Sequence, residues 1–218
     1  MKAVVLFSGG LDSTVLAAQM KQEAKETRLL SIYYGQRHSK ELDHSQKIAD
    51  HLGLGHEILK LPQLGQILSG SSLTDQSIIL PEGHYAEESM KSTVVPNRNM
   101  ILLALAGGHA LSLGFDTIAY AAHAGDHTIY PDCRPEFADS MNKALGLADW
   151  KDLNLHRPYV EMTKSDIVSL GDRLDAPLHL TWSCYAGGEI HCGKCGTCVE
   201  RKEAFELANI ADPTKYEA

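Results

Sequence analysis

The strongest chemical signal in the sequence is a glycine-rich string at residues 8–13, which reads SGGLDS. It follows an apolar stretch typical of a buried strand and directly precedes a stretch with helical spacing. Backbone N–H groups and the dipole at a helix N-terminus attract anions, and glycines let a phosphate approach the backbone closely. Asp12 suits either a helix start or a magnesium ion carried by the phosphates. The string predicts a phosphate-binding loop, and its plain alternative is a Gly-Gly turn between a strand and a helix.

Two common nucleotide-binding loops do not fit these residues. The string lacks the Gly-Lys-Ser/Thr ending of a Walker A loop. It also lacks the third glycine of the dinucleotide fingerprint at the required spacing. A phosphate bound here would therefore be held by a loop of another type.

The second chemical signal is a cluster of four cysteines with the spacing C-x7-C-x2-C-x2-C, formed by Cys184, Cys192, Cys195 and Cys198. Four thiolates so close together suit a tetrahedral zinc ion, and a closed four-cysteine site is structural rather than catalytic. An iron–sulfur cluster is the main alternative, and unrelated free thiols are the plain one. Bound zinc would supply folding energy to a tail that has little core of its own.

Four further residues are candidates for other chemistry. Cys133 stands apart from the cluster, and a buried structural thiol fits it better than a nucleophile does. His123, Asp126 and His127 form a weaker candidate for a second metal site.

Alternating strands and helices would position these residues. Apolar runs predict strands at residues 2–7, 28–34, 56–61 and 116–121. Helical spacing predicts helices at residues 12–21, 40–52, 97–113, 135–147, 163–174 and 199–208. This order predicts an α/β fold with a doubly wound, mostly parallel sheet that has helices on both faces. Ligands of such sheets bind at the carboxyl ends of the strands, which is where string 8–13 lies.

Composition limits the class of protein. The chain has 218 residues, of which 44% are apolar and 22% charged, as in ordinary globular proteins. Its formal net charge of −8 disfavours broad nucleic-acid binding. The sequence shows no signal-peptide pattern and no apolar run of about eighteen residues, so we expect a cytoplasmic protein without a membrane partner. Thiols are reduced there, which favours a metal over disulfides.

Two regions are expected along the chain. Residues 1–176 would form the α/β domain that carries string 8–13, and residues 177–218 a small zinc-binding appendage that ends in a helix. The two would form one compact unit. Residues 69–92 are polar, rich in turn residues and without a period, so we expect a mobile loop near the site.

String 8–13 resembles the loop of the PP-loop pyrophosphatase family, which includes GMP, NAD and asparagine synthetases and tRNA-thiolating enzymes. The resemblance implies a fold like that of the adenine-nucleotide α-hydrolases. It also implies cleavage of ATP, carried with Mg²⁺, between its α- and β-phosphates. AMP would be transferred to the substrate, and pyrophosphate would be bound in the loop.

Three more strings narrow the resemblance: YGQRH at residues 34–38, VPNRN at residues 95–99 and YPDCRPEF at residues 130–137. With the cysteine spacing, they closely resemble the QueC family of 7-cyano-7-deazaguanine synthases over nearly the whole chain. The resemblance implies a homodimeric ligase of queuosine biosynthesis. It would convert 7-carboxy-7-deazaguanine, ammonia and ATP into the nitrile, through an adenylated carboxylate and an amide.

The resemblance also implies site residues. The ATP-binding residues would be Phe7, Ser8, Gly9, Gly10, Leu11, Asp12, Ser13, Thr14, Val15, Leu16, Ala17, Tyr34 and Arg37. The catalytic residues would be Asp12, Ser13, Arg98 and Lys164. The deazaguanine would be bound by Tyr130, Asp132 and Arg134, and zinc by the four cysteines.

Charge and hydrogen bonding suggest individual roles. Arg37 and Arg98 suit a phosphate or the substrate carboxylate, and Lys164 suits a phosphate. Asp132 offers two acceptors to the donors of a guanine-like edge, and Arg134 suits a bidentate contact with the carboxylate. The plain alternatives are exposed basic side chains, a helix cap and a surface salt bridge.

Two features depart from the family pattern: Asn97, where members often carry glycine, and the stretch around His123. A tRNA thiolase of the same superfamily is the alternative enzyme, although no basic RNA-binding extension is visible. A zinc-ribbon binding module without catalysis would leave strings 8–13 and 130–137 unused. The chain is too short to include a glutaminase domain, which favours free ammonia as the nitrogen source.

Overall fold

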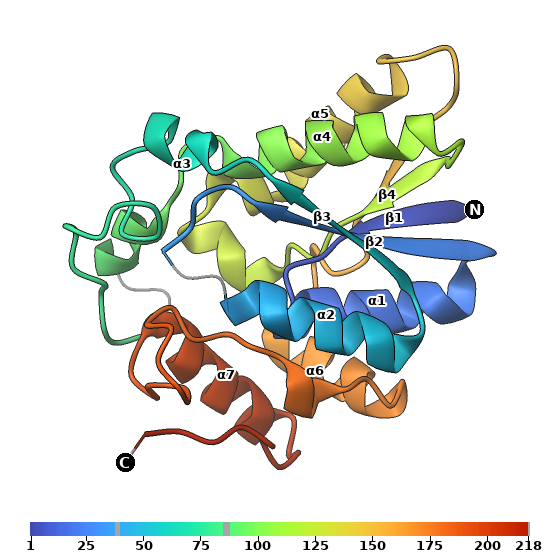
Figure 1. Cartoon of the computed structure of the whole chain (residues 1–218). Helices are drawn as coiled ribbons and strands as arrows, with labels where there is room; N and C mark the ends of the chain where they lie inside the picture. Colours follow the sequence, from blue (N-terminus) through green and yellow to red (C-terminus); the bar gives the residue numbers. More distant parts are fainter. Residues whose placement is uncertain (38–39, 85–87, 218) are drawn as a thin grey trace.

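The computed structural model describes residues 1–37, 40–84 and 88–217, and within them five strands form one parallel sheet in the order β3-β2-β1-β4-β5 (Figure 1). The strands are β1 (Lys2–Leu6), β2 (Glu26–Tyr33), β3 (Gly55–Lys60), β4 (Thr117–Ala119) and β5 (Asn154–His156). In register, Val4 of the central strand β1 lies beside Arg28 of β2 and Ile118 of β4.

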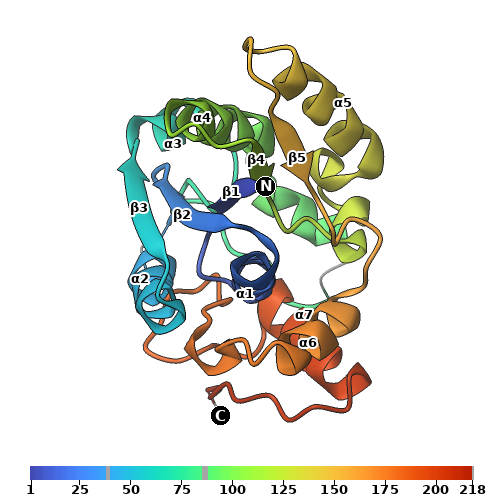
Figure 2. The same cartoon turned by 90° about the vertical axis from the view of Figure 1, so that its right-hand side faces the viewer.

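Helices lie on both faces of the sheet (Figure 2). One side carries α1 (Leu11–Glu23), α2 (Lys40–Leu52) and α6 (Lys164–Arg173), with α7 (Gly196–Leu207) packed against α6. The other side carries α4 (Arg98–Ser112) and α5 (Pro135–Gly146). The short helical segments are α3 (Gln63–Ile67), η1 (Glu88–Thr93), η2 (Ala124–Thr128), η3 (Pro131–Cys133) and η4 (Leu178–Leu180). The predicted doubly wound parallel fold is confirmed.

All ten predicted elements are present, and each boundary lies within three residues of its prediction. Strand β5 was not predicted, because its three residues are too few to show a period. Pairing with β4 is what makes it a strand.

Burial explains the apolar character of β1 and α4. Ala3, Val4 and Val5 have no exposed surface, since β1 is the central strand of a sheet covered on both faces. Helix α4 lies close to α5, and Gly107 permits this approach. A Cβ at Gly107 would come within 2.8 Å of Leu145 Cδ2.

The first residues of α6 and α4 show how these two helices begin. Thr163 caps α6 through a capping box, in which its hydroxyl accepts from the Asp166 N–H and the Asp166 carboxylate accepts from the Thr163 N–H. Asn97 precedes α4 with φ +58° in the left-handed region. After glycine, asparagine tolerates this conformation best, so the departure from glycine at residue 97 fits the backbone.

The strand order places the switch point of the fold at β1 and β4. The chain moves outward from β1 through β2 to β3 and then returns to the other side of β1 to form β4 and β5. Because the connections diverge from this point, the carboxyl ends of β1 and β4 border a crevice, which is the usual ligand site of such sheets.

Much of the segment at residues 69–92 is tied to the rest of the fold. Ser71 and Ser72 are fully buried, and the Leu73 carbonyl accepts from the Arg37 N–H at 2.7 Å. The Arg37 guanidinium donates to the carbonyls of Ser72 and Ile78 at 3.3 and 3.1 Å. Residues 85–87 of this segment, like His38 of the YGQRH string, lie outside the described residues.

The C-terminal region shares the apolar core of the sheet. Leu178 and Phe205 belong to the same buried cluster as Phe7 and Val15. The division at residue 176 remains a prediction. No described helix has both the length and the apolar character needed to cross a membrane.

A fully buried arginine, Arg201 of α7, fastens the last residues of the chain. Its guanidinium donates to Asp212 Oδ1 at 3.2 Å, to Thr181 Oγ1 at 2.7 Å and to the Leu178 carbonyl at 3.2 Å. Its contacts thus join α7 to both the segment before the cysteines and the tail after the helix.

Candidate active site and metal centre

A cavity of about 260 Å³ opens at the carboxyl ends of β1 and β4. Its polar lining comes from segments spread along the whole chain, and it comprises Ser8, Asp12, Ser13, Tyr34, Gln36, Glu41, Arg98, Asn99, Tyr120, Asp126, Cys133, Lys164, Ser183, Tyr185 and Thr197. Its apolar lining includes Phe7, Leu11, Leu102 and Trp182. The crevice expected from the strand order is therefore a chemically mixed pocket with both acidic and basic groups.

Hydrogen bonds within the loop fix string 8–13. The Ser13 hydroxyl donates to the Gly10 carbonyl at 3.2 Å and lies 3.1 Å from the Ser8 hydroxyl. Gly9 has φ +85°, and a Cβ there would lie 2.6 Å from the Glu41 carbonyl of α2, so only glycine fits. The N-cap of α1, Gly10, makes no side-chain cap. The first N–H groups of α1 thus have no capping side chain beside the cavity, as an anion site requires.

The charged centre of the site is formed by Lys164, Asp12 and Glu200. Lys164 Nζ lies 2.9 Å from Asp12 Oδ2 and 2.9 Å from Glu200 Oε2. Burial acts to lower the pKa of Lys164, but the two carboxylates outweigh it and raise the pKa well above its usual value. Burial likewise acts to raise the pKa of Asp12, yet Lys164 lowers it. Lys164 is therefore a permanent cation and Asp12 a permanent anion at neutral pH.

His123 completes this group. It is 1% exposed, its Nδ1 accepts from the Gly125 N–H at 3.1 Å, and its Nε2 lies 3.4 Å from Lys164 Nζ. Nε2 lies 3.6 Å from Asp126 Oδ2 and 3.9 Å from Asp12 Oδ2. Three carboxyl groups thus lie near one ammonium, and burial raises the pKa of one of them, Glu200, although Lys164 acts against the rise.

Asp12 itself offers a ligand atom. Its Oδ1 is buried and has no hydrogen-bond partner among the described residues. A carboxylate oxygen of this kind, on the cavity wall beside a helix N-terminus, suits Mg²⁺ that arrives with a phosphate.

The cavity lining also carries Arg98, Tyr34 and Glu41. Arg98 Nη1 lies 3.5 Å from the Tyr34 hydroxyl. Burial raises the pKa of Glu41 to about 7, although the charge of Arg98 acts against the rise. Cys133 is 5% exposed, and burial raises the pKa of its thiol. Cys133 is therefore a neutral thiol, which agrees with its interpretation as a buried structural cysteine.

The structure brings many of the predicted site residues to this cavity. Those on its lining are Phe7, Ser8, Gly10, Leu11, Asp12, Ser13, Tyr34, Arg98 and Lys164. Gly9 of string 8–13 lies against α2. The Arg37 guanidinium donates instead to carbonyls of the segment at residues 72–78. The remaining predicted ATP residues are buried in α1: Thr14, Val15, Leu16 and Ala17.

The three residues predicted for the substrate do not line the cavity. Asp132 Oδ2 accepts from the Asn99 N–H in the first turn of α4 at 3.0 Å, so this carboxylate caps α4 rather than α5. The Tyr130 hydroxyl lies 2.5 Å from the Thr93 hydroxyl. Arg134 Nε donates to the His127 carbonyl at 2.8 Å. Asp132 thus supports the start of α4, whereas Tyr130 contacts η1 through Thr93 and Arg134 contacts η2 through His127.

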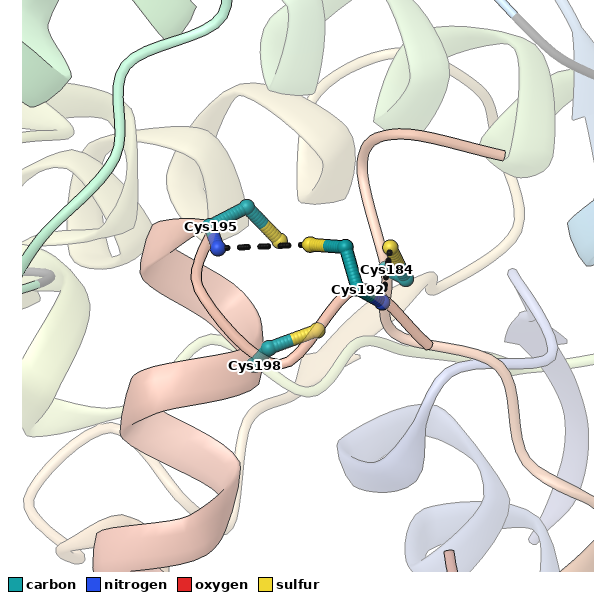
Figure 3. A group of neighbouring side chains, drawn as sticks. All are labelled: Cys184, Cys192, Cys195 and Cys198. Carbon is teal, nitrogen blue, oxygen red and sulfur yellow. Dashed lines mark hydrogen bonds between the residues drawn. The ribbon is translucent and has the colours of Figure 1, made fainter. Parts of the chain in front are cut away.

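The four predicted metal ligands converge (Figure 3). The sulfur atoms of Cys184, Cys192, Cys195 and Cys198 all lie within 4.8 Å of one another, and all four cysteines are buried and free of disulfides. Trp182, Tyr185 and Tyr216 pack against them. Four thiol sulfurs at this spacing fit one tetrahedral metal ion.

Backbone N–H groups donate hydrogen bonds to two of these sulfur atoms, which favours their thiolate form. The Cys192 N–H donates to Cys184 Sγ, and the Cys195 N–H donates to Cys192 Sγ, each at 3.4 Å. Hydrogen bonds from Cys184 and Cys198 lower the pKa of Cys195, and the resulting anion raises the pKa of Cys184 to about 11. The group readily forms one thiolate, and a cation would be needed to hold more.

The weaker metal candidate is not assembled. In the described part of the chain, the four cysteines are the group of three or more potential ligands that come close enough to share an ion. His123 and Asp126 form a capping box at the start of η2 instead.

Three residues of the site were not expected from the sequence: Glu41 and Tyr120 on the cavity lining, and Glu200, which contacts Lys164. Glu200 follows Cys198 by two residues, and Glu41 lies in the first turn of α2. The Tyr120 hydroxyl is buried without a hydrogen-bond partner among the described residues. The position of Tyr120 at the end of a predicted strand was the one available signal.

Relatives with known names match the whole chain. The family model described as queuosine biosynthesis protein QueC matches residues 2–209. The 7-cyano-7-deazaguanine synthase of Brucella anthropi and 7-cyano-7-deazaguanine synthase 1 of Mesorhizobium japonicum are each 53% identical over 219 aligned residues. In both cases the match covers 100% of this chain and 94% of the relative.

Solved structures share the fold at low identity. The NMN synthetase from Francisella tularensis matches with a TM-score of 0.56 and 16% identity, over 96% of this chain and 78% of that one. An NH3-dependent NAD synthetase from Campylobacter jejuni matches with a TM-score of 0.51 and 16% identity, over 82% and 66%. The solved structures share the fold of this chain, and the family model over residues 2–209 together with relatives that match its whole length shows that the chain belongs to the QueC family.

Proposed function

We propose that this chain is an ATP-dependent ligase that converts 7-carboxy-7-deazaguanine and ammonia into 7-cyano-7-deazaguanine. The observation that carries the proposal is the 53% identity, over the full length, to relatives named 7-cyano-7-deazaguanine synthase. The cavity supports it, because the start of α1, which has no side-chain cap, and the carboxyl groups of Asp12 and Asp126 lie on its lining.

The proposed reaction has two rounds of adenylation. In the first, a carboxylate oxygen attacks the α-phosphorus of ATP, pyrophosphate leaves, and ammonia displaces AMP to give the amide and a proton. In the second, the amide oxygen attacks the α-phosphorus of another ATP, pyrophosphate leaves, and loss of AMP with both N–H protons gives the nitrile. Each oxygen of the carboxylate leaves on one AMP. No nucleophilic side chain is required, so positioning and charge stabilisation provide the catalysis.

Roles for the proposed catalytic residues follow from their places. Asp12 would bind Mg²⁺ through Oδ1, and Lys164 would balance the charge of the leaving pyrophosphate. Ser13 would hold the loop in shape through Gly10. Arg98, on the cavity lining at the start of α4, would stabilise the substrate carboxylate or the α-phosphate.

Tyr130, Asp132 and Arg134 remain candidates for the deazaguanine. Asp132 could offer only Oδ1 to the substrate, because Oδ2 is already hydrogen-bonded to Asn99.

The cysteine cluster would hold one structural Zn²⁺. A donor set of four buried thiol sulfurs suits zinc, and no open position remains for catalysis. We further propose that the enzyme is a cytoplasmic homodimer that uses free ammonia, as implied by the family resemblance.

Pyrophosphate release tests the proposal directly. We expect two pyrophosphates per nitrile when ATP, Mg²⁺, ammonia and 7-carboxy-7-deazaguanine are supplied together, with the product identified by mass spectrometry. Without the carboxylated base, release should fall to background. Release that depends on tRNA, or none with the carboxylated base, would refute this function.

A further inference from the structure

The ammonium group of Lys164 lies between carboxylates from opposite ends of the chain. Asp12 belongs to the phosphate loop, whereas Glu200 belongs to α7 behind the cysteine cluster. Both carboxylates are 2.9 Å from Lys164 Nζ. Asp12 is only 22% exposed, Glu200 11% and Lys164 14%, so solvent screens these ion pairs weakly.

Nucleotide binding would require Asp12 and Lys164 to exchange partners. Asp12 is then needed by the cation and Lys164 by the phosphates, yet in the structure each neutralises the other. A lysine that lost its carboxylate partner here would be a poorly solvated charge, which is unfavourable. Glu200 offers a second carboxylate, so Lys164 can stay in place while Asp12 turns to the cation.

The cysteine cluster fixes the position of Glu200. Helix α7 begins at the cluster, and Cys198 and Glu200 are both buried within its first two turns. Whatever holds the four sulfurs together therefore also sets where the Glu200 carboxylate lies.

A second contact links the cluster to the phosphate loop. The Trp182 backbone N–H donates to the Gly9 carbonyl at 3.1 Å, and its indole N–H donates to the Cys184 carbonyl at 2.9 Å. The loop is thus attached to the cluster both through its backbone and through its charge.

We propose that Glu200 is a positioning residue for Lys164, and that the cysteine cluster acts through Glu200 on the affinity of the phosphate loop for nucleotide. This inference rests on the proposed use of ATP. It gives the cluster a part in nucleotide binding in addition to the stability that it gives to the tail.

The variant Glu200→Gln tests this proposal, because it keeps the shape of the side chain and removes its charge. Glu206→Gln, on the exposed side of the same helix, is the matched control. Calorimetry would measure the Kd of α,β-methylene ATP with Mg²⁺, alongside Tm, metal content and KM for 7-carboxy-7-deazaguanine. We expect Glu200→Gln to weaken analogue binding about tenfold or more, since it removes a charge-assisted contact of Lys164.

The other readouts separate positioning from structural damage. Tm, metal content and the KM for the carboxylated base should stay near wild type in Glu200→Gln, and Glu200→Asp should recover part of the affinity. Glu206→Gln should match wild type throughout. An unchanged Kd in Glu200→Gln would overturn the proposal.

A double-mutant cycle with Lys164→Gln decides the case if Glu200→Gln lowers Tm or metal content. Under the proposal, Glu200→Gln should add less than about twofold to the loss caused by Lys164→Gln, because both remove the same interaction. Independent, multiplying losses would overturn it. Failure of the wild-type protein to bind the analogue would instead overturn the proposed use of ATP, and this inference with it.

Discussion

Asp12 and Lys164 face each other at 2.9 Å although 152 residues separate them in the sequence. With Asp126 and Glu200 close by, the acidic groups outnumber the single ammonium. A bare triphosphate would be repelled by this arrangement, whereas one that carries a divalent cation would be attracted. The charge of the site therefore favours an anion that carries a divalent cation, which the loop backbone alone does not.

Replacing Asp12 or Ser13 with alanine should remove most of the activity without unfolding the protein. Asp12→Ala deletes the proposed cation ligand, and we expect pyrophosphate release to fall at least about a hundredfold. Ser13→Ala removes the hydroxyl that joins Gly10 and Ser8, and we expect a loss of about tenfold or more. Steady-state pyrophosphate assays with circular dichroism would check both. Near-normal turnover in the two variants would contradict the phosphate-loop assignment.

The raised pKa of Glu41 predicts a pH-dependent stability. Its folded-state pKa is about 7, against an ordinary 4.5, so the folded state keeps the proton longer as pH rises. Stability contributed by this group is therefore lost between about pH 4.5 and 7 and stays constant above that range. Complete conversion of the shift would give about 3 kcal/mol, and partial contact of the side chain with water should reduce it to about 1–2 kcal/mol.

Glu41→Gln should thus be more stable than wild type at pH 8, by that amount, and equally stable at pH 4.5. Urea unfolding at the two pH values would measure the difference. An equal difference at both pH values would show that Glu41 ionises normally in the folded protein.

Features of the helices, strands and loops can be predicted from the sequence where the residues that form them lie close together in the chain. String 8–13 can be picked out from the sequence because its glycines, serines and helix start lie within six residues, and several of its hydrogen bonds join residues of that span. The cysteines were recognised for the same reason. Glu200 was missed, because its role depends on Lys164 and Asp12, which tertiary packing brings to it.

Arg37 shows the opposite limit of sequence reasoning. It follows a strand at the expected edge of the sheet, yet its guanidinium is bound to carbonyls of a segment about forty residues later. Asp132 likewise has a side chain suited to bind a ligand, but its carboxylate accepts a hydrogen bond from the Asn99 N–H at the start of α4. Residue type and strand end can place a side chain near the cavity, but they cannot say what it contacts.

The cysteine cluster should hold one zinc ion per chain. Replacing both Cys192 and Cys195 with serine should abolish metal binding and lower the free energy of unfolding by on the order of 5 kcal/mol, because metal binding contributes to folding. Cys133→Ser, which changes a buried cysteine outside the cluster, is the control and should keep its zinc. Elemental analysis and chemical denaturation measure both effects. Iron with a visible absorption band would contradict the zinc assignment.

At the scale of the whole molecule, the apolar core connects regions that the sequence separates. Val5 of β1, Val15 of α1, Leu178 and Phe205 belong to one buried cluster. The cavity joins the same regions, since its lining runs from Leu6 to residues beyond the first cysteine. A ligand in this cavity would contact the sheet edge, α1, α4 and the cysteine segment at once.

We therefore expect one cooperative thermal transition for the metal-bound protein, because residues 177–217 cannot leave without exposing the core under α1. A ligand that binds only the folded state at a hundred times its Kd adds about 2.7 kcal/mol. For a chain of this length, that corresponds to a rise in Tm of about 5–10 °C. Scanning calorimetry with α,β-methylene ATP and Mg²⁺ would measure the rise, and Asp12→Ala should abolish most of it. Two separate transitions, with only the first responding to the analogue, would show that the cysteine region folds independently of the nucleotide site.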